Sequence, residues 1–225
     1  MKNIQIKFKL NKELDKQMGF QFLDMKTGGV DFSEGMIFYH SCLKEIREIK
    51  NKQKRWDQLS EYVDNFYLDN GKKMQKCLKI IKEDWSRVEK DFFMEVDKIF
   101  KGYKWPKGEY ICYLSIFNNN PRFLENKTWQ IFYQTPEEYK RIVAHEMLHF
   151  IFLDYFEKNN TEQRLKDNWW MISEVFNTVI LNTLGFKKII KPGKELGYPD
   201  HKEIIERMAK EWKILKNLEK WLTKF

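Results

Sequence analysis

The chain has 225 residues, of which 42% are hydrophobic and 16% aromatic, so it can build a core and is not a disordered chain. Its 41 basic and 33 acidic residues give a formal net charge of +8. Lysines and glutamates alternate along the chain, which favours a solvated helical surface over a surface for nucleic acid or an anionic membrane.

Cysteine usage and the N-terminal residues predict a compartment. Cys42, Cys77 and Cys112 are odd in number and form no C-x-x-C pair, which argues against a disulfide framework and against a thiolate zinc site. The N-terminal segment has no apolar block of the signal-peptide kind, and no run of about 18 apolar residues occurs that would span a bilayer. We therefore expect a cytoplasmic protein that does not enter a membrane.

The N-terminal part is predicted to be one strand followed by long helices. Residues 4–10, IQIKFKL, alternate apolar and polar with a period of two, which indicates a short strand. From Ser33 to Asp69, and from Lys72 to Lys101, apolar residues recur at three- and four-residue intervals, which indicates amphipathic helices. The sequence DNG at 69–71 is typical of a turn between them.

The chain then changes character. Residues 110–117 and 128–134 are rich in β-branched and aromatic residues on either side of the turn-prone NNNP, and predict two strands of a small sheet. Thr135, Pro136 and Glu138 form a capping box that predicts the start of a helix through Lys158. A further helix is expected to end at Gly185, followed by a loop over KPGKELGYP and a long terminal helix.

These elements predict an α+β fold, mostly helical, with a small mixed β-sheet packed on a central helix and the helix after it. We expect a strand and long helices over 1–105 and a second unit with the C-terminal helix over 106–225. The pattern is compatible with two domains and with one continuous domain.

The central helix contains His145, Glu146 and His149 in the order H-E-x-x-H. Residues four apart on a helix differ by roughly 40° in azimuth and 6 Å in height, so both imidazoles can reach one cation. Glu146 is about 100° from His145, where a carboxylate can take a proton from water without being a ligand. The alternative is a pair of hydrogen-bonded core histidines, because the helix is apolar on most of its surface.

Catalytic zinc needs a third protein ligand. Asp154 and Glu157 on the same helix point away or lie too far along it, and Phe152 and Tyr155 exclude the longer metzincin motif. Glu174 is the only acid in the apolar run WWMISEVFNTVILN, where an ionised carboxylate is costly unless it is paired or coordinated. The alternative for Glu174 is a half-exposed position at a helix edge.

Asn177 and Thr178 form a narrow polar stripe beside Glu174 on the same helix. We expect one of them to hydrogen-bond the second nitrogen of a ligand histidine or the Glu174 carboxylate. Further along, LGYPDH offers Tyr198 and His201 as donors to an oxyanion, with a Tyr-Pro helix start and a solvent histidine as the alternative. His40 has no acidic companion at ligand spacing and is expected to pack between helices.

H-E-x-x-H on one helix and a glutamate on the next resemble the gluzincin metallopeptidases, the thermolysin and aminopeptidase superfamily, and especially its small members. WMISEVFN is similar to their second motif, with Val175 in place of the usual glycine and Thr178 in place of an acidic residue. The resemblance covers residues 110–185 at most. It implies that His145, His149 and Glu174 bind Zn²⁺, that Glu146 is the general base, and that 128–134 is an edge strand that takes an extended peptide.

The predicted function is therefore a zinc metallopeptidase that hydrolyses peptide bonds with a zinc-bound water activated by Glu146. The expected partner is a peptide or protein substrate. One alternative is a zincin-fold binding protein that is inactive or latent. The other is a basic helical nucleic-acid-binding protein with an incidental motif, for which the sequence offers only diffuse charge.

Overall fold

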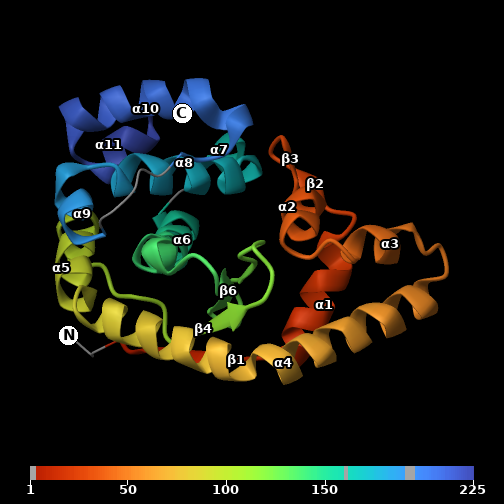
Figure 1. Cartoon of the computed structure of the whole chain (residues 1–225). Helices are drawn as coiled ribbons and strands as arrows, with labels where there is room; N and C mark the ends of the chain where they lie inside the picture. The colour runs from red at the N-terminus through yellow and green to blue at the C-terminus, as the bar shows by residue number, and fades with distance from the viewer. Residues whose placement is uncertain (1–3, 160–161, 191–195) are drawn as a thin grey trace. The chain divides into compact units, whose positions relative to one another are not determined.

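The computed structural model describes residues 4–159, 162–190 and 196–225 (Figure 1). The chain divides into two compact units, residues 1–83 with 108–136 and residues 84–107 with 137–225. The expected division near residue 105 differs from this one, because the later strands belong with the N-terminal residues. Within the described ranges, none of the helices has the length and apolar character needed to cross a membrane.

The first unit is built on a four-stranded mixed sheet with the order β1-β4-β6-β5. β1 and β4 are parallel, with Ile6 opposite Tyr110, and β4 and β6 are also parallel, whereas β5 and β6 are antiparallel. The three predicted strands are confirmed, as is the α+β class with a small mixed sheet. The bounds are β1 Ile6–Leu10, β4 Tyr110–Ser115, β5 Arg122–Phe123 and β6 Thr128–Phe132.

The prediction that residues 128–134 form an edge strand is wrong. β6 lies between β4 and β5, and all five of its residues are buried. Beyond the short β5, the backbone N–H of Gln130 donates to the Pro121 carbonyl at 2.9 Å and that of Phe132 donates to Asn120 Oδ1 at 3.1 Å. The segment 120–123 therefore uses the donors that a peptide substrate would need for strand addition.

The helices of the first unit include one that runs through the expected turn. α4 is continuous from Lys52 to Ser86, although DNG lies at 69–71. Gly71 has open space around it, and the fully buried Val63 and Met74, 11 residues apart, keep one apolar stripe across the glycine. The other elements of this unit are α1 Lys12–Phe22, β2 Lys26–Thr27, β3 Val30–Asp31, α2 Phe32–Tyr39 and α3 Leu43–Glu48.

A buried carboxylate ties α1 to the sheet and to α4. Asp15 has no exposed surface and accepts hydrogen bonds from Ser115 Oγ at 2.6 Å, Gln130 Nε2 at 2.6 Å, Tyr67 Oη at 2.7 Å and the Ile116 N–H at 3.3 Å. Burial raises the pKa of Asp15 from its ordinary 3.8 to about 6, against the opposing effect of these donors.

His40 is buried in the same unit, as expected of a packing residue. Its Nε2 lies 2.8 Å from the Ile116 carbonyl oxygen, which can only accept, so this nitrogen carries the proton. Its Nδ1 therefore accepts from the Tyr62 hydroxyl at 2.6 Å. His40 thus satisfies both nitrogens within the core and takes no part in the site described below.

The second unit is helical. α6 packs against α8, where the rings of Phe152 and Phe176 stack with centroids 4.4 Å apart. α10 and α11 lie along α8 in Figure 1, and the Trp221 indole donates to the Met208 carbonyl at 2.8 Å. The helices are α5 Glu89–Phe100, α6 Tyr139–Asn159, α7 Gln163–Asp167, α8 Trp169–Leu181, α9 Leu184–Ile189, α10 Lys202–Leu215 and α11 Leu218–Leu222, with 3-10 turns at Pro136–Glu138 and Pro199–His201.

Three predicted helix boundaries in this unit are wrong. The capping-box residues Pro136–Glu138 form a 3-10 turn, and α6 begins at Tyr139. α8 ends at Leu181, and Gly185 lies inside the short α9. The terminal helix breaks at Lys216, which has a φ of 44°, because the Asn217 side chain caps a new helix. In the predicted loop KPGKELGYP, residues 191–195 lie outside the described residues.

Candidate metal centre

The two histidines of the motif project from α6 at neighbouring turns. His149 has no exposed surface, and the side chain of His145 is 14% exposed. Their Nε2 atoms lie 2.9 Å apart, as the four-residue spacing on one helix allows. Most of the residues of α6 are buried, and the two imidazole nitrogens converge at one point beside it.

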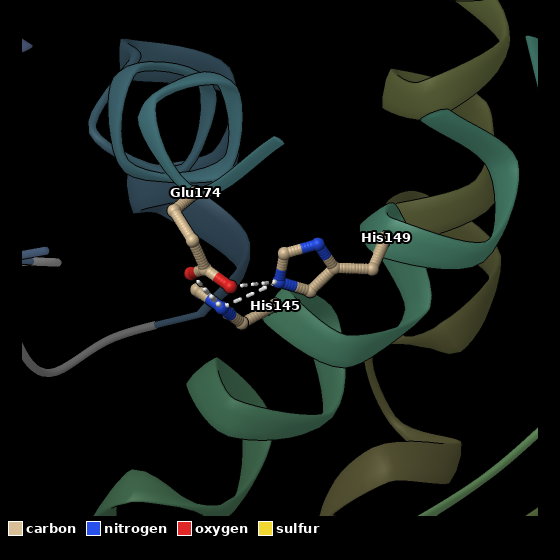
Figure 2. A group of neighbouring side chains, drawn as sticks. All are labelled: His145, His149 and Glu174. Carbon is tan, nitrogen blue, oxygen red and sulfur yellow. Dashed lines mark hydrogen bonds and ion pairs between the residues drawn. The ribbon is translucent and has the colours of Figure 1, made fainter. Parts of the chain in front are cut away.

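Glu174 reaches the same point from α8 (Figure 2). Its Oε2 lies 3.3 Å from His145 Nε2, and its Oε1 lies 3.2 Å from His149 Nε2. Glu174 is 4% exposed, so its half-exposed alternative is wrong. Among the described residues these three form a group of possible metal ligands whose donor atoms lie within 4.8 Å of one another.

The contacts of His149 Nδ1 suit a tautomer in which this nitrogen carries the proton. Ser173 Oγ donates to the Trp170 carbonyl at 3.1 Å, which uses the only hydroxyl hydrogen. His149 Nδ1 lies 3.0 Å from the same Oγ, which can accept from Nδ1–H. In that tautomer Nε2 has a lone pair, which faces His145 and Glu174.

The three groups fit a divalent cation. A proton on His145 Nε2 can satisfy the contact with His149 or the contact with Glu174, whereas a metal ion satisfies all three groups together. Ligands about 2.0–2.1 Å from a tetrahedral zinc lie about 3.3 Å from one another. The two nitrogen–oxygen separations, 3.2 and 3.3 Å, match this value, and the nitrogen–nitrogen separation of 2.9 Å would widen slightly on binding.

The electrostatics of Glu174 are consistent with a site for positive charge. Burial opposes ionisation of its carboxyl group, but His149 and His145 outweigh this effect and hold the pKa of Glu174 well below its usual range. Glu174 is therefore a carboxylate in a buried place, where a charge needs a partner of opposite sign.

The remaining residue of the motif, Glu146, follows His145 on α6 and is 5% exposed. A buried carboxylate beside such a histidine has the chemistry of a general base. Among the described residues, the group of possible metal ligands consists of His145, His149 and Glu174, without Glu146.

Neither Asn177 nor Thr178 has the role expected from the sequence. Asn177 Nδ2 donates to the backbone carbonyl of His145 at 2.8 Å, and Thr178 Oγ1 donates to the backbone carbonyl of Glu174 at 2.9 Å. Both are buried, so each satisfies a helix carbonyl, not a ring nitrogen or the carboxylate. Asn177 still fixes α8 to α6 at the level of the first histidine.

Ser173 does what was expected of these two residues, and sequence reasoning missed it. It precedes Glu174 and has no exposed surface. The one available signal was a small hydroxyl beside the only acid of an apolar helix. Its geometric role depends on the rotation of α8 relative to α6, which spacing along one helix does not give.

Tyr198 lies near the helix that carries Glu174. Trp170, Glu174 and Thr178 are spaced four residues apart and so lie along one face of α8. A Cβ on Gly197 would approach Thr178 Oγ1 to 2.8 Å, and the Tyr198 ring lies 5.1 Å from that of Trp170. The segment around Tyr198 therefore follows the face of α8 that carries Glu174.

His201 joins the same aromatic cluster. Its ring centroid lies 5.2 Å from that of Trp170 and 5.8 Å from that of Tyr198. The Tyr-Pro helix start is present as the turn Pro199–His201, but His201 is 8% exposed, so the expectation of a solvent histidine is wrong. Both candidate oxyanion donors are thus packed one helical turn from Glu174 along α8.

Comparison with known proteins gives no relative. No family model, curated protein or solved structure matches the chain. What the site does must therefore be inferred from its own residues.

Proposed function

We propose that the chain is a zinc-dependent metallopeptidase of gluzincin type with a zincin-like catalytic unit. In this proposal His145, His149 and Glu174 hold Zn²⁺, and Glu146 is the general base. The observation that carries it is the convergence of two imidazole Nε2 atoms and a buried carboxylate within 3.3 Å of one another, with Ser173 Oγ 3.0 Å from the second ring nitrogen of His149.

Bound zinc supplies a Lewis acid that polarises the scissile carbonyl and lowers the pKa of water. The chain's own residues then move the protons. Glu146 takes a proton from the attacking water and passes it to the leaving amine. Tyr198 or His201 donates a hydrogen bond to the oxyanion that develops on the substrate carbonyl, which makes the negative charge less costly in a buried site.

The experiment measures bound zinc and cleavage of a generic peptide library on the same preparation. Wild type is expected to bind zinc and to cleave, and Glu146→Gln is expected to keep the zinc and lose turnover. The substitution removes the proton acceptor and keeps the size of the side chain. Zinc-free wild type, or cleavage by Glu146→Gln at the wild-type rate, would contradict the proposal.

A second candidate function is a zinc-binding protein without turnover. It is favoured by the burial of the site, since Glu146 is 5% exposed and His149 has no exposed surface. Bound zinc in wild type without cleavage of any library peptide would support this candidate over the peptidase.

A further inference from the structure

We propose that Ser173 is a positioning residue that holds His149 with Nε2 directed at the zinc site, by accepting a hydrogen bond from Nδ1–H when Nε2 binds the metal ion. This inference rests on the proposed metal site and assigns it a residue that the sequence motif does not contain. The resembled family usually has an acidic residue on this helix. In this chain a serine beside Glu174 contacts the second histidine instead.

The contacts of Ser173 suit a histidine whose Nε2 binds a metal ion. The serine hydroxyl donates to the Trp170 carbonyl over 3.1 Å. The serine oxygen keeps lone pairs, and His149 Nδ1, which carries the proton once Nε2 binds a metal ion, lies 3.0 Å from it and can donate to it. His149 and Ser173 both have no exposed surface, so water does not compete for these bonds.

Removal of the serine hydroxyl should weaken zinc binding. With zinc on Nε2, the proton of the neutral imidazole is on Nδ1, and Ser173 Oγ is an acceptor 3.0 Å from it. In Ser173→Ala this buried N–H loses that acceptor, which costs free energy. The metal-free protein can avoid the cost, because its proton can move to Nε2, 3.2 Å from Glu174 Oε1. The loss should therefore be seen in the affinity for zinc.

α8 also offers a matched control. Thr178 is another buried hydroxyl residue on this helix, and it donates to the backbone carbonyl of Glu174 at 2.9 Å, much as Ser173 donates to that of Trp170. Within the described part of the chain, Thr178 makes no hydrogen bond to a ring nitrogen. Thr178→Val removes the same kind of helix hydrogen bond and leaves His149 unchanged, so it separates a general effect on α8 from a specific effect on His149.

The experiment compares the dissociation constant for zinc of wild type, Ser173→Ala, Ser173→Thr and Thr178→Val, measured by competition with a chelator. Circular dichroism establishes that each variant is folded before the measurement.

Wild type and Thr178→Val are expected to bind zinc equally tightly. Ser173→Ala is expected to bind zinc about 10- to 100-fold more weakly, the usual effect of removing such a partner. Ser173→Thr restores the hydroxyl and should recover the affinity of wild type.

Two results would overturn the inference, and a third separates it from the proposed function. Wild-type zinc affinity in Ser173→Ala would overturn it and leave the metal site standing. An equal loss of affinity in Thr178→Val would also overturn it, because the effect would then belong to α8 in general. If wild type binds no zinc, the inference and the proposed function both fail.

Discussion

Asp15→Asn is expected to change how the stability of the protein depends on pH. The folded-state pKa of Asp15 is about 6, compared with 3.8 for the ordinary group, so the folded protein holds this proton more tightly than the unfolded chain does. The stability that follows is fully present below pH 3.8 and is lost as the pH rises through about 6.

The size of this effect follows from the shift. Each pKa unit is worth about 1.36 kcal/mol, so the difference between 3.8 and about 6 amounts to about 3 kcal/mol. Asparagine stays neutral over the whole range. The difference in unfolding free energy between wild type and Asp15→Asn should therefore shift by about 3 kcal/mol, in favour of the variant, between the acid and neutral limits.

Urea unfolding at a series of pH values from 4 to 7 measures this difference, and the comparison cancels every group that the two proteins share. Asp31→Asn is a control whose difference should stay nearly constant over this range, because the Lys26 and Ser33 hydrogen bonds lower the pKa of Asp31 from 3.8 to about 2 and its contribution is lost only below pH 4. A difference for Asp15→Asn that stays constant would refute the reasoning. A difference that moves in favour of wild type as the pH rises would show that the four hydrogen bonds outweigh burial.

Tyr198→Phe is expected to lower kcat about 10²- to 10³-fold with zinc affinity unchanged, if Tyr198 is the oxyanion donor, and an unchanged kcat would remove it from that role. Gly197→Ala should lower the free energy of unfolding by about 1–2 kcal/mol, because Gly197 has a left-handed backbone. The added Cβ would also approach Thr178, and the shift of Tyr198 should change the fluorescence of Trp170, whose ring it contacts. Trp221→Ala should lower the free energy of unfolding, measured with urea, by about 3–5 kcal/mol, because the indole is fully buried and donates to the Met208 carbonyl. A decrease below about 1 kcal/mol would contradict this packing.

The strands and the central helix were predictable because their signals are local and strong. Alternation over 4–10 and aromatic, β-branched runs near 110 and 128 predict strands without knowledge of their partners. The order of the strands was not predictable. Only the pairing of Ile6 with Tyr110, over 100 residues along the chain, places β4 beside β1, and the order then places β6 in the interior.

The two errors in helix boundaries at glycines, Gly71 and Gly185, have a common physical cause. Gly71 and Gly185 are weak helix formers, and the sequence rule treats them as breaks. In the structure the fully buried Met74 holds α4 in one stripe across Gly71, and the buried Phe186 holds α9 around Gly185. Tertiary packing outweighs a local preference of about 1 kcal/mol.

The candidate site shows the same division between local and long-range information. The spacing of His145 and His149 and the isolation of Glu174 in an apolar helix predicted three groups that converge in the structure. The contacts of Ser173, Asn177 and Thr178 depend on the rotation of α8 against α6, so sequence spacing assigned Asn177 and Thr178 wrongly and missed Ser173. Polar partners around a site are set by packing between helices, which a pattern on one helix cannot provide.

The zinc content of wild type, His149→Ala and Glu174→Ala, measured after equilibration with zinc and removal of excess metal, tests the central claim most directly. Asp154→Ala is the matched control. Asp154 is an acidic residue on α6, the helix that carries His149, and its carboxylate accepts hydrogen bonds from Tyr103 and Lys158. Wild type and Asp154→Ala are expected to retain zinc and the two site variants to lose it. Equal zinc in all four proteins, or none in wild type, would contradict the account.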